Sequence, residues 1–589
     1  MNIERLEQVW RRVISVAPFG AVDRDTADAS AGSTGGRSRL RTVASGLLTG
    51  SACVLVWFAL VGPNQTQRLT PLAFVRVPLE GLLLVGLVLV LPPRARRITA
   101  VLAGFVLGVL TILKILDMGF FAALGRPFDP MIDWSYLGSL EGLLGDSIGR
   151  RGAILSLVAA GVLGVALLAL LPLAALRLAR IAHRHRATSA RAVVALGAVW
   201  IVCAAIGVQV GTSTPVASTS AAGLAWHQVS QVGTDIRDQH RFARALTNDP
   251  LHDVPADQLL TGLRGKDVVV AFVESYGRVA VQDSAFSPQV DAVLDAGTNK
   301  LRAAGFSSRS AFLTSPTFGG ISWLAHSTLQ SGLWINNQLR YNKLVASKRS
   351  TLADAFRRAG WHTVDDVPSN HANWEPGTTF YHYDKIYDSR NVGYAGPKFS
   401  YGTMPDQYIL SAFQRNELAK PHHMPVMAEI DLVSSHTPWA PLPRMVDWDK
   451  VGDGSVFDSM PAQGQSPKAV WRDADKVRAA YGQSVQYSMS ALISFVQTFH
   501  DNNLVLVLLG DHQPATIVSG SGASHDVPIT IIAHDPAVMD RITGWGWQDG
   551  MRPSPNAPVW PMDAFRDRFL TAYGPQPPPN PSPLSQARR

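Results

Sequence analysis

Residues that commonly bind metal ions lie at the ends of four predicted strands in the second half of this 589-residue chain. These are Glu274 at the end of DVVVAFVE, His436 in SSHTPW, Asp511 and His512 in GDH, and His525 before DVPITII. In open α/β sheets, ligands bind beyond the carboxyl ends of the strands. Carboxylate and imidazole groups are ligands of Zn²⁺ and Mn²⁺. Each residue alone is typical of a turn, whereas the set predicts a metal site at one edge of a sheet.

A serine in the stretch PTFGGISWLAHSTLQSG is a candidate nucleophile at that edge. Ser322 follows two glycines and opens a predicted helix that ends at Gly332. A serine in this position is usually a helix N-cap. However, a glycine-rich turn and a helix N-terminus also bind anions, and a bound metal ion lowers the pKa of a hydroxyl group. The metal-binding residues therefore favour a catalytic role for Ser322. Three nearby hydroxyl side chains compete with it: Ser315, Thr317 and Ser327.

The elements that would position these residues alternate between strand and helix. A continuous apolar run predicts a buried strand in DVVVAFVES, from residue 267. Further patterns predict strands at 361–367, 425–433, 504–510 and 528–534, and helices at 351–359 and near 475–500. Such alternation is typical of an α/β sheet with helices on both faces.

The first half of the chain carries the excess of apolar residues that raises the mean hydropathy to +0.08. A membrane-spanning helix needs about 20 mostly apolar residues. We expect five such helices, at 44–62, 77–92, 98–116, 153–176 and 192–210. The second begins beside Arg76 and Glu80, so the alternative for it is a re-entrant or interfacial helix.

Arginine clusters orient the predicted membrane domain. They lie at 37–41, 94–97 and 177–191, and five crossings place all three on one side of the membrane. The positive-inside rule makes that side the cytoplasm, apart from a minor exception at Arg150 and Arg151. The N-terminus is then inside, and the C-terminal domain is extracytoplasmic.

The chain thus divides into five predicted segments. They are a cytoplasmic segment 1–43, a membrane domain 44–212, a connector 213–262 with an amphipathic helix, a catalytic domain 263–574 and a disordered Pro-rich tail 575–589. The cytoplasmic loops account for the net charge of +8, and no basic stripe predicts a nucleic-acid partner. Cys53 and Cys203 both fall in predicted spans, so the exported domain has no thiol chemistry.

Taken together, these motifs resemble the alkaline phosphatase and sulfatase superfamily. The shared pattern is a first strand ending in an acidic residue, a hydroxyl residue at a helix start about 50 residues later, SHTPW and GDH. With five preceding spans, the chain looks most like the membrane-anchored lipoteichoic acid synthases, which transfer phosphoglycerol, and like the related phosphoethanolamine transferases. The resemblance implies an α-helical membrane domain followed by an alkaline-phosphatase-like α/β domain.

The resemblance also implies roles for individual residues. Glu274, Ser322, Asp511 and His512 would bind one divalent metal ion, Mn²⁺ or Zn²⁺. Ser322 would also be the nucleophile, since its spacing to Gly332 matches the family. His436 would contact the substrate phosphate or assist the leaving group, and His525 would do likewise or help to hold a second metal ion.

The implied reaction transfers a phospho-alcohol group from a membrane phospholipid to a cell-envelope glycolipid or polymer through a phosphoserine. The alternatives are a phosphodiesterase or phosphatase, and more distantly a sulfatase. Two departures bear on the substrate: the sulfatase signature is absent after Ser322, and the transferases use threonine at that position.

Three further residues are candidates for substrate binding. Trp374 and Asp406 lie in regions rich in polar and aromatic residues, and Arg278 follows the first strand. Each has a simpler interpretation as a surface or core residue, because binding pockets use only a few polar groups.

Overall fold

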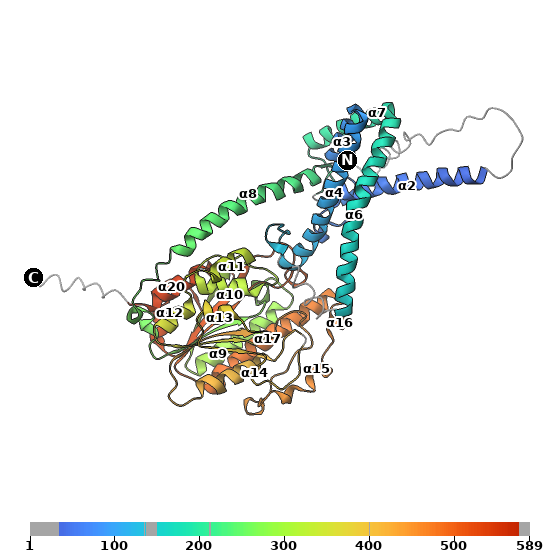
Figure 1. The fold of residues 1–589 in the computed structure, drawn as a ribbon. Helices are drawn as coiled ribbons and strands as arrows, with labels where there is room; N and C mark the ends of the chain where they lie inside the picture. Colours follow the sequence, from blue (N-terminus) through green and yellow to red (C-terminus); the bar gives the residue numbers. More distant parts are fainter. Residues whose placement is uncertain (1–34, 135, 137–149, 211–213, 400, 576–589) are drawn as a thin grey trace, which may run out of the picture.

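The computed structural model describes residues 35–134, 136, 150–210, 214–399 and 401–575. Most of the predicted cytoplasmic segment 1–43 and nearly all of the predicted tail 575–589 lie outside these residues. Within the described part, a set of apolar helices precedes a large α/β domain (Figure 1).

Four described helices are long and apolar enough to cross a membrane. They are α2 (Gly35–Val61), α4 (Pro93–Leu124), α6 (Arg150–Arg184) and α7 (Arg186–Ala205). The second of the five predicted spans is instead α3 (Leu79–Val90), a helix of 12 residues. At about 1.5 Å per residue it is about 18 Å long, which is less than the roughly 30 Å of a bilayer core.

Prolines explain why α3 is short. Pro78 precedes the helix, and the next apolar helix starts directly after Pro92, so backbone hydrogen bonding cannot continue through this point. The structure therefore has four helices of spanning length among the described residues, and a shorter apolar helix that packs against them. The extracytoplasmic orientation, which was derived from five crossings, stays a prediction.

The connector contains the predicted amphipathic helix as α8 (Ser220–Thr247), which runs from the apolar helices to the α/β domain (Figure 1). Near its start, the Ala222 backbone amide donates to Glu80. Towards its end, Asp238 forms an ion pair with Arg340, and Phe242 is buried in the core of the α/β domain. The helix thus contacts both parts of the chain.

Two short strand pairs lie beside the apolar helices: β1 (Val77–Pro78) with β4 (Ala217–Ser218), and β2 (Gln209–Val210) with β3 (Thr214–Pro215).

A mixed nine-stranded sheet forms the centre of the α/β domain. The strand order is β12-β6-β11-β10-β5-β9-β7-β8, and β13 also pairs with β6. The strands are β5 (Asp267–Val273), β6 (Ser307–Thr314), β7 (His362–Val367), β8 (Lys385–Asp388), β9 (Val426–Leu432), β10 (Leu504–Gly510), β11 (Asp526–Ala533), β12 (Gln548–Asp549) and β13 (Val559–Pro561). All five predicted strands are present, within two residues of their expected bounds.

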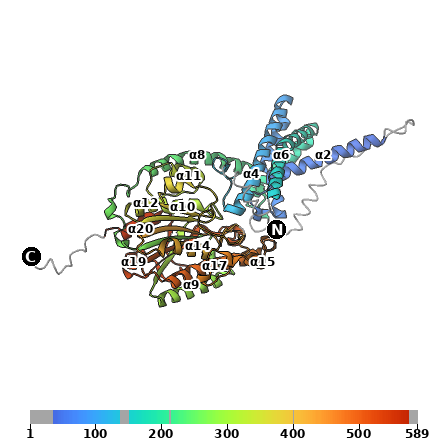
Figure 2. The same cartoon turned by 60° about the horizontal axis from the view of Figure 1, so that its bottom comes forward.

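Helices cover both faces of the sheet, as the alternating pattern predicts (Figure 2). On one face lie α9 (Ser287–Ala303), α14 (Asp406–Phe413) and α17 (Ala474–Phe499); on the other lie α10 (Ser322–Ser331), α12 (Leu352–Arg358) and α20 (Ala564–Tyr573). Successive residues of β5 alternate between the two cores, because strand side chains point to opposite faces. Shorter helices complete the domain: α11 (Gln338–Val345), α13 (Glu375–Thr379), α15 (Met460–Gln463), α16 (Pro467–Val470), α18 (Thr516–Ser519) and α19 (Pro536–Asp540).

The strand directions bring the predicted site residues to one edge. Strands β5, β9 and β10 are parallel, so Glu274, His436 and Asp511 all follow carboxyl ends on the same side. Strand β11 is antiparallel to β10, so its first residue, Asp526, lies at this edge too.

Candidate metal and nucleophile site

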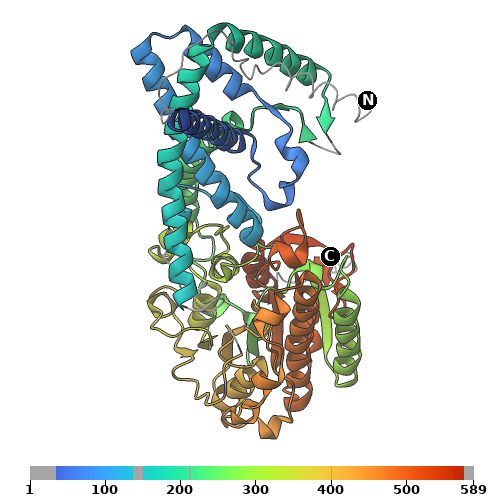
Figure 3. The same ribbon diagram turned by 90° about the vertical axis from the view of Figure 1, so that its right-hand side faces the viewer.

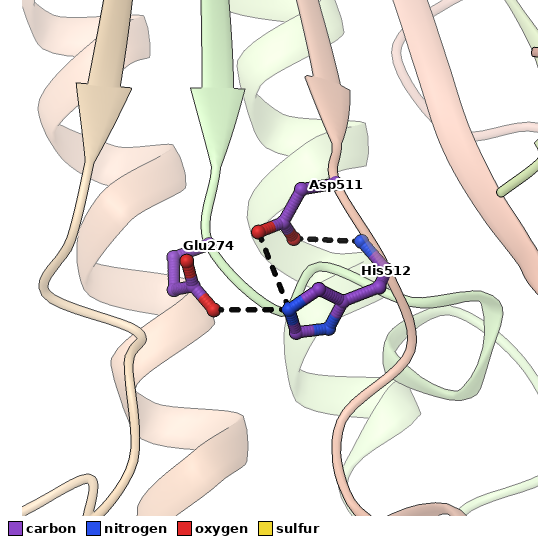
Figure 4. Close-up of side chains that lie close together, drawn as sticks. All are labelled: Glu274, Asp511 and His512. Atoms are coloured by element: carbon purple, nitrogen blue, oxygen red, sulfur yellow. Dashed lines mark hydrogen bonds and ion pairs between the residues drawn. The ribbon is translucent and has the colours of Figure 1, made fainter. Parts of the chain in front are cut away.

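Three predicted ligands converge beyond the ends of β5 and β10 (Figure 4). Glu274, Asp511 and His512 each offer a ligand atom within 4.8 Å of the others. His512 Nε2 lies 3.3 Å from Glu274 Oε1 and 3.5 Å from Asp511 Oδ2. Asp511 and His512 are fully buried, and the Glu274 side chain is 11% exposed. Asp511 and His512 directly follow β10, so one strand end supplies two of the three.

Hydrogen bonds fix the orientation of the ligand atoms. His512 Nδ1 lies 2.8 Å from the Gln513 carbonyl oxygen, which only accepts, so Nδ1 carries the proton and Nε2 faces the cluster. Asp511 Oδ1 accepts from the backbone amides of Ser275 and His512, both at 2.7 Å. Asp511 Oδ2 is buried without a hydrogen-bond partner.

The charges of the cluster perturb one another. Burial raises the pKa of Asp511, and the nearby Glu274 carboxylate raises it further, to about 7. Burial opposes a charge on Glu274 as well, but His436 and His512 outweigh it and hold the pKa of Glu274 well below its ordinary value. Burial disfavours charge on His512, yet Asp511 and Glu274 raise its pKa to about 9. The carboxylates of Glu274 and Asp511 thus oppose each other's charge, and the nearby His512 offsets this repulsion.

A divalent cation fits this donor set. Two carboxylates and an imidazole nitrogen are ligands of both Zn²⁺ and Mn²⁺. The buried Asp511 Oδ2 has no hydrogen-bond partner. His512 donates from Nδ1 to a carbonyl oxygen, as metal-binding histidines usually do, and this leaves Nε2 directed to the cluster. Glu274, Asp511 and His512 would therefore hold the metal ion that the sequence predicts.

Ser322 joins this cluster through its side chain. Its Oγ donates to Glu274 Oε2 at 2.9 Å and lies 3.2 Å from His512 Nε2. Ser322 is the first residue of α10, and the N-cap is Ile321, which makes no side-chain capping bond. The hydroxyl group of Ser322 is thus directed to the predicted metal ligands rather than to the helix backbone. Two of the three competing hydroxyls do not share this position: Ser315 Oγ donates to the Asp511 carbonyl, and Ser327 Oγ bonds within its own helix and to Tyr381.

The turn before Ser322 has an unusual backbone. Gly319 and Ile321 have φ values of +72° and +67°. A β-branched residue rarely adopts positive φ, and such strain costs about 1–3 kcal/mol unless the surroundings impose it. Here the end of helix α4 packs against the turn. A Cβ on Gly319 would lie 1.8 Å from the Ala123 carbonyl oxygen, and Thr516 Oγ1 donates to the Ala122 carbonyl at 2.8 Å.

We predict that Gly319→Ala lowers activity strongly, because the added Cβ must displace the end of α4 or the turn that carries Ser322. A nucleophile misplaced by about 1 Å loses about 100-fold in rate. The measurement is turnover of the full-length protein in detergent or vesicles. The matched control is Gly522→Ala, where φ is +78° but a Cβ would meet nothing within 4 Å. Equal losses in both variants would mean that backbone strain, not the α4 contact, is responsible.

Ser322 and its neighbours open into a pocket of about 480 Å³. His436 and Trp374, both predicted to bind substrate, line this pocket, together with Tyr381 and Tyr401. The His436 ring stacks on Tyr401 at 3.6 Å, and its Nδ1 donates to the Thr437 carbonyl at 2.6 Å. A carbonyl oxygen only accepts, so Nδ1 of His436 carries a proton.

Three other predicted site residues do not line the pocket. Arg278 donates to Asp526, Gln282 and the Pro555 carbonyl, which is the simpler interpretation considered for it above. Asp406 is fully buried and accepts from Ser434 and Ser488, and burial raises its pKa to about 6. The His525 ring lies beside Phe318, and burial lowers its pKa.

The structure adds a second group of ionisable residues that the sequence interpretation passed over. His326, Glu429 and Asp431 lie together in the wall of the same pocket. A signal was available: His326 is one helical turn after Ser322, and Glu429 and Asp431 are two apart on one strand, so each pair shares a face.

No family model and no curated protein matches the chain. Its structure is similar to that of the lipoteichoic acid synthase LtaP from Listeria monocytogenes, with 13% identity, a TM-score of 0.35, and coverage of 54% of this chain and 74% of that one. A protein in the alkaline phosphatase superfamily from Vibrio parahaemolyticus gives 16% identity, a TM-score of 0.35, and coverage of 57% and 74%.

The soluble domain of lipooligosaccharide phosphoethanolamine transferase A from Neisseria meningitidis gives 12% identity, a TM-score of 0.34, and coverage of 55% and 93%. By name, these proteins are a lipoteichoic acid synthase, an alkaline phosphatase superfamily protein and a phosphoethanolamine transferase, which are the groups that the sequence motifs resemble. At such low TM-scores they add nothing to the assignment of the site, which depends on the contacts described above.

Proposed function

We propose that this protein is a metal-dependent phosphotransferase that moves a phospho-alcohol group from a membrane phospholipid to a cell-envelope acceptor through a covalent intermediate on Ser322. The observation that carries the proposal is the placement of one hydroxyl group. Ser322 Oγ lies within hydrogen-bond distance of both Glu274 and His512, at the first residue of a helix. Free amides at a helix N-terminus favour the phosphate group that such a nucleophile attacks.

A divalent cation bound to Glu274, Asp511 and His512 would stabilise negative charge on the phosphoryl oxygens and lower the pKa of the serine hydroxyl. Proton transfers accompany the changes in bonding. Ser322 Oγ forms a bond to phosphorus and loses its proton to water, since the low pKa of Glu274 makes this carboxylate a hydrogen-bond acceptor rather than a base. The bond from phosphorus to the diacylglycerol oxygen breaks, and protonated His436 donates a proton to that oxygen.

The second displacement reverses these roles. An acceptor hydroxyl gives its proton to His436 and attacks phosphorus. The bond from phosphorus to Ser322 Oγ breaks, and Ser322 recovers a proton from water. His436 suits both steps because its Nδ1 is held by the Thr437 carbonyl, so a single nitrogen, Nε2, exchanges the proton.

The contact between the apolar helices and the nucleophile turn supports a lipid donor. Helix α4 ends against the α/β domain at Gly319, three residues before Ser322 (Figure 3). A lipid at the surface of a membrane that α4 crosses would therefore have its head group close to the pocket. The same geometry would serve a hydrolase, in which water replaces the acceptor hydroxyl.

Mass spectrometry of Ser322 tests the proposal. The full-length protein is incubated with phospholipid vesicles without an acceptor, quenched in acid and digested. We expect the peptide containing Ser322 to gain the mass of a phospho-alcohol group, and the vesicles to release diacylglycerol. Release of free phospho-alcohol without any acceptor product, when envelope glycolipids are supplied, would favour the hydrolase. An unmodified Ser322 during continuing turnover would contradict the covalent mechanism.

A further inference from the structure

A second cluster in the pocket wall has the composition of a metal site. His326 Nδ1 lies 3.0 Å from Glu429 Oε1 and 3.4 Å from Asp431 Oδ1. The three ligand atoms all lie within 4.8 Å of one another. Ligand atoms that each lie about 2.0–2.2 Å from one cation are separated from one another by distances like these 3.0 Å and 3.4 Å contacts.

These three side chains come from two elements that pack together, and neighbouring residues hold them in place. Glu429 and Asp431 lie on the same face of β9, and His326 comes from α10, which covers that face. The His326 ring stacks on Phe272 of β5, with 3.8 Å between ring centroids and 11° between planes. Tyr383 donates to Glu429 Oε2 at 2.8 Å, and Gln330 donates to the same oxygen. Outer hydrogen bonds of this kind orient the ligands of a metal ion.

A further buried carboxylate supports a cation site here. Asp365 lies opposite Glu429 on the neighbouring strand β7, lines the same pocket and is 2% exposed. Its Oδ2 atom has no hydrogen-bond partner, and neither has Asp431 Oδ1. A buried carboxylate oxygen without a partner is costly, because water no longer solvates it.

The charge of the whole pocket points the same way. Five carboxylates line it: Glu274, Asp365, Glu429, Asp431 and Asp511. None of the described lining residues is lysine or arginine. A phosphate group entering this pocket would meet mainly negative charge, and one cation at Glu274, Asp511 and His512 would leave His326 alone to balance the carboxylates of β7 and β9.

We propose that His326, Glu429 and Asp431 bind a second divalent cation, of the Mn²⁺ or Zn²⁺ class, with Asp365 as an additional carboxylate beside it. Imidazole and carboxylate ligands are those that such ions take. The ion neutralises the strand carboxylates and gives the pocket a positive charge one helical turn from Ser322. Its binding does not depend on the transferase reaction.

The test is a metal count. The full-length protein in detergent is stripped with a chelator, saturated with Mn²⁺ alone, passed through gel filtration, and analysed for bound manganese. We expect two ions per wild-type chain. Asp431→Asn and His326→Gln should each retain one, and so should Asp511→Asn, which removes the other ion. The two variants of the second site differ in chemistry, so a folding defect in one leaves the other informative.

Asp366→Asn is the matched control and should keep both ions. Asp366 is a buried neighbour of Asp365 on the same strand, but it does not line the pocket. A single ion in the wild type that is lost only in Asp511→Asn would overturn the second site. Two ions that both persist in Asp431→Asn and His326→Gln would overturn it too. Two ions with no covalent group on Ser322 would instead refute the proposed function and leave this site standing.

Discussion

Ser322→Ala is expected to abolish transfer of the labelled head group from phospholipid. The substitution removes the only side-chain atom of α10 that reaches both Glu274 and His512 among the interactions of the described residues. When a covalent nucleophile is lost, rates fall by a factor on the order of 10⁴ to 10⁶. The measurement is transfer of a radiolabelled head group by membranes or purified full-length protein, normalised to the amount of folded enzyme.

Two companion variants separate chemistry from folding. Ser331→Ala lies on the same helix, where the Ser331 hydroxyl bonds to the Ser327 carbonyl, and it should leave transfer largely intact. Ser322→Thr keeps a hydroxyl group at the same position and should recover part of the activity. Wild-type activity in Ser322→Ala would exclude Ser322 as the nucleophile and return attention to Thr317, which lies near the same edge.

Asp511→Asn is expected to have the second-largest effect, through loss of the predicted catalytic metal ion. The amide keeps the size of the side chain but supplies neither a negative charge nor the second carboxylate oxygen that has no hydrogen-bond partner. Altering even the outer partners of a metal site costs about 10–100-fold in affinity or activity, so the loss of a direct ligand should cost at least about 100-fold. Activity and bound metal should fall together.

Chelation of the wild type provides an independent check of this metal site. Removing the ion should stop transfer, and adding Mn²⁺ or Zn²⁺ should restore it. Because the ion binds the folded state, its return should also raise the melting temperature. At a metal concentration 100 times the dissociation constant, the free energy of unfolding should increase by about 2.7 kcal/mol. Asp511→Asn should show a smaller metal-dependent shift. Full activity after exhaustive chelation would contradict a metal-dependent reaction.

Much of the secondary structure of the α/β domain is predictable from the sequence, because the hydrophobic pattern of a short segment indicates whether it forms a strand or a helix. The continuous apolar run of β5 and the long amphipathic pattern of α17 specify their own secondary structure within a residue or two. Glu274, Asp511 and His512 were also predictable, since each directly follows a strand and parallel strands end at one edge. Their convergence also needs β5 and β10 to be parallel neighbours, which the alternation of helices and strands does not specify and the structure has.

Other residues required the tertiary structure, because their roles depend on partners far away in the chain. Arg278 and Asp406 are polar residues near the predicted site, but Asp526 and Ser488 engage them outside the pocket. His326, in contrast, was not predicted to be a site residue. It reaches Glu429 and Asp431, about 100 residues later in the chain, only because α10 packs over β9.

Sequence patterns alone are enough to predict the two-part architecture, three candidate metal ligands and a serine near them. These depend on hydrophobic periodicity and on turns at strand ends, which short segments encode. Packing of the folded chain, in contrast, directs the Ser322 hydroxyl towards Glu274 and His512 rather than to the backbone of its helix. It also brought the end of α4 against Gly319 and gathered five carboxylates in one pocket. Side-chain direction and charge balance are set by packing between distant elements, which no local pattern records.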